Sequence, residues 1–211
     1  VLPYFRARGI KELDALIISH DDIDHIGGVA DVIKEIKVNK ILGNKKYEFE
    51  VIPSEICHSH NDWIWDGVSF DFLHPAQDIS FEGNNASCVL KIGHGKDSVL
   101  ISGDIEYQAE DLLIETTSAF LRSNILLAPH HGSKTSSKSR FIRVVNPENV
   151  IFSTGYLNRF KLPNKDIITR YMRNGSSIWD TASDGAIHIE YKGEQYTITS
   201  ERQNRAKFWN E

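Results

Sequence analysis

The stretch that decides the fold is residues 13–28, which read Leu13-Asp-Ala-Leu-Ile-Ile-Ser-His20-Asp-Asp22-Ile-Asp24-His25-Ile-Gly-Gly28. Its first half is a short apolar run that includes β-branched residues, a pattern typical of a buried strand. The second half places four imidazole or carboxylate groups within six residues, directly after the strand. Rigid scaffolds commonly present chemical groups in this way, on a loop at a strand end.

The spacing of these four groups favours the binding of two metal ions. His20 and Asp22 are two residues apart, so they project to one side of an extended or tightly looping backbone. We expect this pair to hold one ion, and Asp24 and His25 to serve a second. Imidazole and carboxylate ligands suit zinc, iron or manganese, and the carboxylate share favours the harder ions. A solvated acidic loop is the alternative, which the density of the cluster makes weaker.

Two later strands are predicted to end in groups of the same kind. Residues 98–103 lead into Asp104, and residues 125–129 lead into His130 and His131. We expect Asp104 to bridge the two ions and His131 to complete the second ion site. A Gly-Asp pair alone is usually a turn and a His-His pair alone is often structural, so this interpretation depends on their combination with the first loop.

Hydrophobic periodicity predicts strands that alternate with helices along the chain. The expected helices lie within 29–36, 105–113, 141–145 and 164–175, and the expected strands lie within 13–19, 40–42, 68–72, 88–92, 98–102, 124–128 and 150–153. Asn164 is the expected N-cap of the last helix and Gly175 its stop. Residues 186–191 and 196–199 predict a final hairpin. This order predicts an α/β fold of two packed sheets with helices outside, in a single domain of residues 1–211.

The composition is that of an ordinary globular protein of 211 residues, with 40% hydrophobic and 25% charged residues. Its net charge of −5 argues against a dedicated DNA-binding module with a broad basic surface. Cys57 and Cys88 lie outside any CxxC pattern, so they support neither a thiolate zinc site nor a disulfide framework. No apolar stretch reaches the ~18–20 residues that span a bilayer and no signal-peptide pattern occurs, so we expect the chain as given to be soluble.

Five segments of the chain carry a resemblance to a known family. They are VLPYFRARGIKELDALIISHDDIDHIGG, NNASCVLKIGHGKDSVLISGDIEYQAEDLL, ILLAPHHGSKTSS, NPENVIFSTGYLNR and DTASDGAIHIE. In this order they resemble the metallo-β-lactamase-like domain at the C-terminus of the ComEC family of DNA-uptake channel proteins. The HxDxDHxGG pattern marks the superfamily, and the later Asn-Asn, Gly-Asp-Ile-Glu and His-His-Gly-Ser segments mark the branch. The resemblance implies the metallo-β-lactamase fold, a four-layer αββα sandwich.

The same resemblance implies a metal-dependent phosphodiesterase or nuclease that degrades the DNA strand not imported during natural transformation. It implies two divalent ions, zinc or manganese, with the ligands His20, Asp22, Asp24, His25, Asp104 and His131. The residues with an expected catalytic role are Asp24, Asp104 and His130, the last as a phosphate or oxyanion contact. The implied partners are DNA and the membrane channel portion of the same protein, and no small organic cofactor is expected. The domain is then expected at the cell membrane, on its periplasmic or extracellular side.

Substrate contacts are expected from residues around the same loops, namely Asn85, His130, Ser133, Lys134 and Arg159. Asn85 falls where other superfamily members bring a further ligand, but an amide is a poor metal ligand and a supporting role is expected. A DNA backbone would be contacted by five positive charges, Lys134, Lys138, Arg140, Arg159 and Lys161. Ordinary surface lysines and arginines are an equally good interpretation of this set.

Two departures from the family pattern leave other functions open. Leu162 stands before Pro163 where the family commonly has His, which removes a substrate contact and leaves open a weak or absent activity. The first pair of strands found in relatives does not occur here, so we expect one sheet to be incomplete and its edge exposed. The alternatives are therefore hydrolysis of a small ester or phosphodiester on the same scaffold, and a silent domain that binds DNA or packs on a channel.

Overall fold

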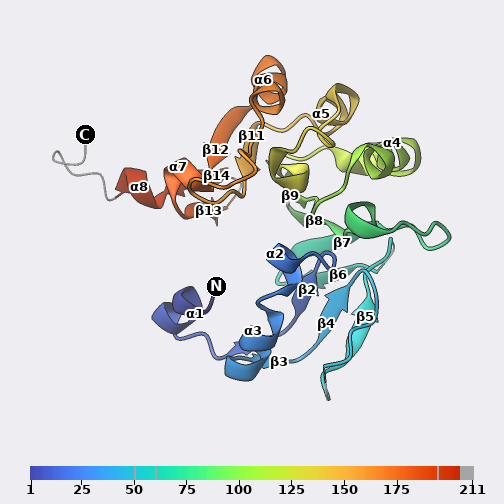
Figure 1. Ribbon diagram of the computed structural model, residues 1–211, viewed down its shortest axis with the longest axis vertical. Helices are drawn as coiled ribbons and strands as arrows, with labels where there is room; N and C mark the ends of the chain where they lie inside the picture. Colours follow the sequence, from blue (N-terminus) through green and yellow to red (C-terminus); the bar gives the residue numbers. More distant parts are fainter. Residues whose placement is uncertain (50, 60, 194, 205–211) are drawn as a thin grey trace.

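Two β-sheets of unequal size lie at the centre of the computed structural model, which describes residues 1–49, 51–59, 61–193 and 195–204 (Figure 1). The smaller sheet has three parallel strands: β2 (Leu16–Ile18), β4 (Ile41–Gly43) and β5 (Ser54–Ile56). Two further strand pairs flank the sheets: β1 (Glu12–Leu13) with β3 (Lys37–Val38), and β13 (Ile187–Lys192) with β14 (Gln195–Ser200). The second pair is the predicted final hairpin, which is confirmed.

The larger sheet has seven strands in the order β12-β11-β10-β9-β8-β7-β6. Their bounds are β6 (Trp63–Trp65), β7 (Val68–His74), β8 (Val89–His94), β9 (Asp97–Ile101), β10 (Ile125–Leu127), β11 (Asn149–Phe152) and β12 (Ser177–Asp180). Strands β6 to β9 pair antiparallel, and β9 to β12 pair parallel. Parallel neighbours need crossover connections, so the carboxyl ends of β9, β10 and β11 lie along one edge of the sheet.

Helices supply these crossovers and the outer layers. The three that connect the parallel strands are α4 (Tyr107–Leu121), α5 (Ser139–Val145) and α6 (Lys165–Arg173). The remaining helices are α1 (Leu2–Arg8), α2 (Ile23–Ile26), α3 (Val29–Glu35), α7 (Thr181–Asp184) and α8 (Glu201–Asn204). Asn164 accepts a hydrogen bond from the Asp166 N–H, so the predicted N-cap of α6 is confirmed. Within the described ranges, no helix has the length and apolar character needed to cross a bilayer.

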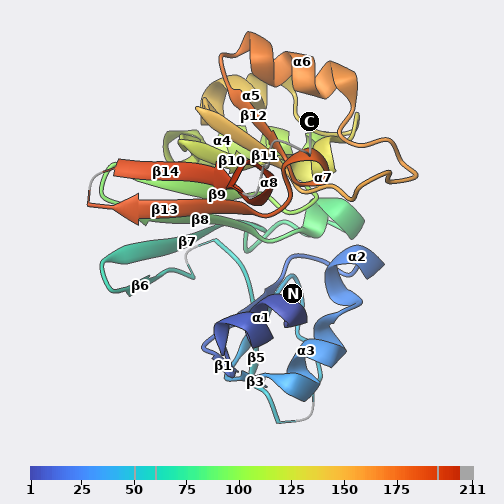
Figure 2. The same ribbon diagram turned by 90° about the vertical axis from the view of Figure 1, so that its left-hand side faces the viewer.

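Alternating side chains along the strands divide the interior into layers. In β4, Ile41 packs in the cluster that includes α3, whereas Leu42 packs between the two sheets. In β7, Phe72 packs between the sheets and Leu73 packs toward α4, α5 and α6. The helices α4 to α6 therefore cover one side of the larger sheet, and α3 covers the smaller sheet (Figures 1 and 2). This is the predicted αββα order, which is confirmed.

A disulfide bond joins the two sheets. Cys57 follows β5 of the smaller sheet and Cys88 precedes β8 of the larger one, and their Cα atoms are 6.0 Å apart. Both cysteines are buried in the cluster between the sheets. The sequence supported no disulfide because pairing depends on the distance between residues that are remote along the chain.

Strand β2 forms one edge of the smaller sheet. Among the described residues it pairs only with β4, and Ile17 on it is 36% exposed. The chain leaves this edge strand at Ile18 and enters the loop that carries the first group of candidate ligands. The edge strand therefore also positions the site.

Candidate metal centre

The candidate site lies where loops from both sheets meet. The loop of residues 19–25 follows β2 of the smaller sheet, and Asp104 follows β9 of the larger sheet. Strand β10 leads into a 3₁₀ turn, Pro129–Gly132, that carries the histidine pair. A backbone hydrogen bond of 2.9 Å from the Cys88 N–H to the Ser19 carbonyl ties the first loop to the larger sheet. Loops that are remote in sequence are thus held side by side.

Four imidazole rings surround the carboxylate of Asp104, which is 4% exposed. The Nε2 atoms of His25 and His131 lie 3.3 and 3.4 Å from its oxygens. Those of His130 and His20 lie 3.9 and 4.0 Å away. In the described part of the chain, one group of four residues has donor atoms within 4.8 Å of one another, and its members are Asp24, His25, Asp104 and His131. The structure therefore brings these four predicted ligands together.

The other two predicted ligands, His20 and Asp22, lie next to this group, and His20 Nε2 is 4.0 Å from an Asp104 oxygen. His20 Nε2 is 3.6 Å from an Asp22 oxygen, and its ring is 1% exposed. Among the described residues, this nitrogen is buried without a hydrogen-bond partner. An unpartnered buried nitrogen is costly unless something else satisfies it. A cation held between His20, Asp22 and Asp104 would do so.

The donor geometry fits a divalent cation. The Nε2 atoms of His25 and His131 are 3.4 Å apart. Two nitrogens that bind zinc tetrahedrally at ~2.0–2.1 Å lie about 3.3 Å from each other. The donors are imidazoles and carboxylates, which suit zinc, iron or manganese. The residues present therefore fit the metal ions that the motif predicts.

Hydrogen bonds at the rear of the rings aim the Nε2 atoms at the centre. Ser19 Oγ lies 3.2 Å from His20 Nδ1 and 3.0 Å from His25 Nδ1. His131 Nδ1 donates to the Ser153 carbonyl at 2.7 Å. A ring whose Nδ1 carries the donated proton leaves Nε2 free as a ligand, and such partners also fix the ring orientation. Neither serine was predicted to take part. Ser153 acts through its backbone carbonyl, which any residue could supply, and Ser19 does not belong to the spacing pattern of the ligands.

The carboxyl group of Asp104 is ionised although it is buried. Burial opposes its charge, but hydrogen bonds with His131 and His25 prevail and hold the pKa of Asp104 well below its ordinary value. The hydrogen bond with Asp104 raises the pKa of His131 to about 9. The centre is thus organised around a buried negative charge, and a metal ion would compete with the proton on His131.

His130 lies beside the centre and is held by a carboxylate that was not predicted to take part. Its Nδ1 is 3.2 Å from Glu106 Oε1 and 3.1 Å from Thr135 Oγ1. His130 and His131 have φ values of 47° and 53°, a left-handed conformation that is rare outside glycine. Glu106 belongs to the Gly-Asp-Ile-Glu segment, so its position two residues after Asp104 was the signal that could have identified it.

Asn85 is placed near the centre but its oxygen serves a helix. The side-chain Oδ1 accepts hydrogen bonds from the backbone N–H groups of Glu106 and Ala109, at 2.9 and 3.2 Å. These N–H groups lie at the start of α4, where backbone donors lack partners within the helix. Asn85 therefore caps α4 and sets the position of the segment after Asp104. Its contact with a substrate stays a prediction.

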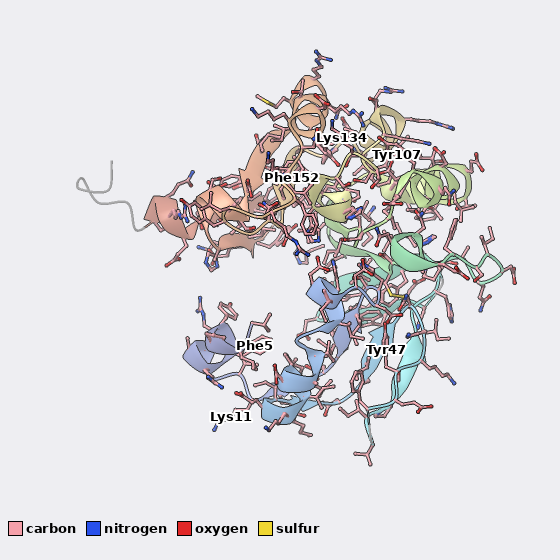
Figure 3. All side chains as sticks on the ribbon, viewed as in Figure 1. Phe5, Lys11, Tyr47, Tyr107, Lys134 and Phe152 are labelled. Carbon is pink, nitrogen blue, oxygen red and sulfur yellow. A yellow bond between two sulfur atoms is a disulfide. The ribbon has the colours of Figure 1, made fainter. Side chains whose placement is uncertain are left out.

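The other predicted substrate contacts lie on the loops that follow β10 and β11. Ser133 Oγ lies 3.1 Å from Thr135 Oγ1, and Lys134 Nζ lies 3.7 Å from Asp166 on the exposed surface (Figure 3). Arg159 is exposed in the loop after β11. Lys138 is instead engaged by Asp111 at 2.5 Å, so its charge is compensated. Of the five positive charges expected to contact DNA, Lys134 and Lys138 are thus each paired with an aspartate.

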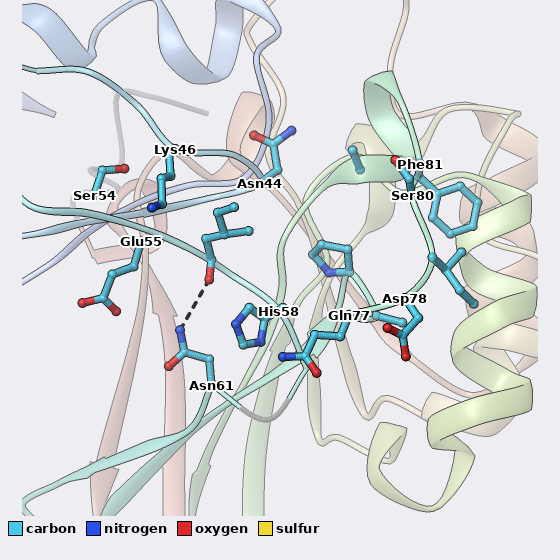
Figure 4. Close-up of a pocket in the computed structure, with 15 residues that line it drawn as sticks. Asn44, Lys46, Ser54, Glu55, His58, Asn61, Gln77, Asp78, Ser80 and Phe81 are labelled. Carbon is cyan, nitrogen blue, oxygen red and sulfur yellow. Dashed lines mark hydrogen bonds between the residues drawn. The ribbon is translucent and has the colours of Figure 1, made fainter.

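A separate hollow of about 830 Å³ is formed by residues around β5 and by the segment after β7 (Figure 4). Its lining includes the amides of Asn44, Asn61 and Gln77 together with apolar side chains, and it contains none of the six predicted ligands. Ala86, which lies between Asn85 and Ser87, is also part of the lining. The hollow is therefore distinct from the candidate metal site.

Comparison with known proteins gives a match over most of the chain. Residues 2–156 match the family model described as "Metallo-beta-lactamase superfamily". This range contains all six predicted ligands. The match thus covers the same loops that meet at Asp104.

Curated relatives match nearly the whole chain. "Recombination protein 2" of Haemophilus influenzae is 32% identical over 208 residues, which cover 99% of this chain and 26% of that protein. "Competence protein ComA" of Neisseria gonorrhoeae is 34% identical over 189 residues, which cover 90% of this chain and 27% of that protein. The chain therefore spans about a quarter of the length of these relatives.

Among solved structures, a similar one is CmlA, a diiron beta-hydroxylase from Streptomyces venezuelae. The TM-score is 0.52 and the sequences are 9% identical, with 81% of this chain and 44% of the other covered. At this identity, the likeness shows a shared fold and carries no information on the reaction.

Proposed function

The chain belongs to the metallo-beta-lactamase superfamily, and from this premise we propose that it is a metal-dependent hydrolase that cleaves phosphodiester bonds in DNA during DNA uptake. The observation that carries the proposal is the convergence of Asp24, His25 and His131 on the buried carboxylate of Asp104. Members of this superfamily are usually hydrolytic and metal-dependent. The donor set of this chain fits that chemistry.

The residues divide the work of such a site. Asp24, His25, Asp104 and His131 would hold one cation, and His20 and Asp22 would hold a second. Divalent cations supply Lewis acidity, which activates water and neutralises charge that develops on a phosphoryl oxygen.

Neighbouring side chains then position the reacting groups. Glu106 orients the His130 ring so that Nε2 faces the centre, where it contacts a phosphoryl oxygen. The hydroxyl of Ser19 and the carbonyl of Ser153 keep the ligand rings in place. The proposal requires no side chain as nucleophile.

DNA as the substrate is supported by the relatives. Their names refer to recombination and competence, and their match covers 90% or more of this chain. Because the chain spans about a quarter of their length, we propose that it works attached to a membrane channel portion. The disulfide between Cys57 and Cys88 supports a position outside the cytoplasm, since disulfides persist in oxidising compartments.

The test is a cleavage assay with labelled single- and double-stranded DNA in manganese, magnesium or zinc, together with metal analysis of the purified chain. We expect bound metal and metal-dependent cleavage, both lost in Asp104→Asn. The matched control is Asp14→Asn, which changes an exposed aspartate just before β2, at the end of the strand away from the candidate ligands. This variant should retain bound metal and DNA cleavage. Stoichiometric metal without any DNA cleavage would contradict the proposal.

A second candidate is hydrolysis of a small ester or phosphodiester. The hollow described above favours it, because a volume of about 830 Å³ is in the range of pockets that hold small organic ligands. Turnover of a small chromogenic carboxylic ester or phosphodiester, without cleavage of DNA, would support this candidate. DNA binding without turnover of either substrate would support a catalytically inactive domain that only binds DNA. This alternative is suggested by Leu162, which stands where the family commonly has histidine.

A further inference from the structure

The loop between β11 and α6 exposes three large apolar side chains. Tyr156, Leu157 and Phe160 are 72%, 84% and 67% exposed. Single exposed apolar residues are common, but three within five residues form a local apolar cluster. We call residues 154–163 the aromatic loop. Figure 2 shows it projecting between β11 and α6 on the side of the molecule where α2 lies.

The aromatic loop is held in shape by its own hydrogen bonds. Asn158 Nδ2 donates to the carbonyls of Gly155 and Leu162, at 3.1 and 2.7 Å, and its Oδ1 accepts from the Leu162 N–H at 2.9 Å. Leu157 and Lys161 have φ values of 53° and 56°, which side chains other than glycine rarely adopt. Such conformations persist where surrounding contacts enforce them, and they cluster at functional sites. The loop therefore presents its apolar side chains outward in a fixed arrangement.

Both ends of the aromatic loop are attached to the candidate metal centre. Just before it, the Ser153 carbonyl accepts the hydrogen bond from His131 Nδ1 at 2.7 Å. Just after it, the Asn164 N–H donates to the Gly132 carbonyl at 3.0 Å. Tyr156 is three residues from Ser153, so the chain places it at most about 10 Å from that anchor. The aromatic loop thus begins and ends beside the 3₁₀ turn that carries His131.

Positive charge accompanies the aromatic rings. The Arg159 guanidinium lies 4.7 Å from the centroid of Phe160, and that of Arg202 lies 5.9 Å from the centroid of Tyr156. Lys161 adds a further charge, and the loop contains no Asp or Glu. Aromatic rings interleaved with cations are the composition that binds single-stranded nucleic acid, since bases stack on rings and cations contact phosphates.

We propose that the aromatic loop is a stacking platform for the unpaired bases of a single DNA strand whose phosphate lies at the metal centre. Tyr156 and Phe160 stack on bases, and Arg159 and Lys161 contact the backbone. Bases in a duplex already stack on their neighbours, so the loop makes a single strand the preferred substrate. This inference rests on the proposed function, because it concerns how the same site holds DNA.

The test measures binding without cleavage, by fluorescence anisotropy in EDTA. The probes are a labelled oligothymidine of about 12 nucleotides and a blunt hairpin duplex. We expect the double variant Tyr156→Ala/Phe160→Ala to bind the single strand about 10- to 100-fold more weakly, because each stacked base contributes substantially. Duplex affinity should change by less than about 3-fold, since backbone contacts by cations remain.

Two controls separate stacking from other effects. Phe120→Ala removes a phenylalanine of similar exposure, 64%, at the end of α4 and should bind like the unchanged chain. An abasic strand of equal length should bind the unchanged chain and the double variant equally, because it offers no base to stack. Tyr156→Phe/Phe160→Tyr keeps both rings and should keep the affinity. All these side chains are exposed, so equal melting temperatures are expected.

Three outcomes would overturn the inference. The first is an unchanged affinity of the double variant for the single strand, and the second is an equal loss for single strand and duplex. The third is a loss of binding to phosphatidylglycerol vesicles without a loss on DNA, which would assign the loop to a lipid surface. If the unchanged chain cleaves DNA, any of these removes the loop proposal alone. If it neither binds nor cleaves DNA, the proposed function fails and the loop proposal with it.

Discussion

The carboxylate of Asp104 shows how the centre depends on single residues. It is buried among imidazoles from two loops, and its charge is stabilised there by hydrogen bonds with His131 and His25. The local motifs predicted this residue and its neighbours as ligands, and their role as ligands stays a prediction. Glu106, Ser19 and Ser153 were not predicted, because their parts depend on contacts with loops far away in sequence.

At this scale, Glu106→Gln tests whether Glu106 is a positioning residue for His130. The substitution keeps the size of the side chain but removes the charge that lies 3.2 Å from His130 Nδ1. We expect kcat for phosphodiester cleavage to fall roughly 10-fold with little change in bound metal, as is common for residues that orient a functional group. Glu115→Gln, at an exposed position of α4, is the control. A loss of metal with unchanged kcat per bound ion would contradict this assignment.

At the scale of elements, the short loops that follow the strands set the positions of the candidate ligands. Gly103 connects β9 to Asp104 with a φ of 54°, and a Cβ atom there would lie 2.8 Å from Ser87 Cβ and 3.1 Å from Ser19 Cβ. Ser87 Oγ in turn accepts the Asp104 N–H at 3.1 Å. The turn is therefore closed both by backbone conformation and by the packing of the two neighbouring loops.

Gly103→Ala should destabilise the protein by about 2–4 kcal/mol, because the left-handed conformation and the close packing both disfavour a side chain. Metal affinity should fall as well, since Asp104 must shift. Gly9→Ala is the matched control. Gly9 has a φ of 67°, but a Cβ atom added there would meet nothing within 4 Å. The free energy of unfolding should therefore fall by about 1 kcal/mol, from the backbone conformation alone. Urea denaturation measures both values. Equal effects at the two positions would show that packing at Gly103 is unimportant.

Most of the strands were predicted from their apolar residues. The seven-residue β7 was expected, and so were the three-residue β2, β4 and β10. Strands β5 and β6 were not expected: β5 has a single apolar residue, Ile56, and β6 is an isolated apolar triplet between polar residues. A turn signal for β6 was present: Asp66-Gly67, with φ values of 48° and 80°, joins β6 to β7 as a tight hairpin. Pro3 and Gly9 likewise mark the start and end of α1.

At the scale of the whole molecule, the two sheets must stay in register for the loops to meet. The Cys57–Cys88 disulfide links them, and Cys88 directly follows Ser87, whose hydroxyl contacts Asp104. The apolar cluster between the sheets has few fully buried residues. A covalent link is therefore expected to contribute to the stability of the site as well as of the fold.

Cys57→Ser/Cys88→Ser should lower the free energy of unfolding by about 3–4 kcal/mol, as expected for a bond that closes a loop of 31 residues. Urea denaturation of the oxidised chain, of the same chain in dithiothreitol and of the double variant provides the measurement. The reduced chain and the variant should agree and should also bind metal more weakly. Identical midpoints for oxidised and reduced protein would show that the bond contributes nothing.

The sequence by itself determined the types of donor, the loops that carry them and the αββα order, and the relatives named as competence proteins confirm the resemblance seen in its motifs. These features are local, because strand and helix periodicity and ligand spacing are read within short windows. Only the tertiary structure decided that Asn85 caps α4, that Cys57 meets Cys88, and that the aromatic loop is anchored on His131 and Gly132. Each of these depends on a distance between residues remote in sequence, which no local pattern encodes.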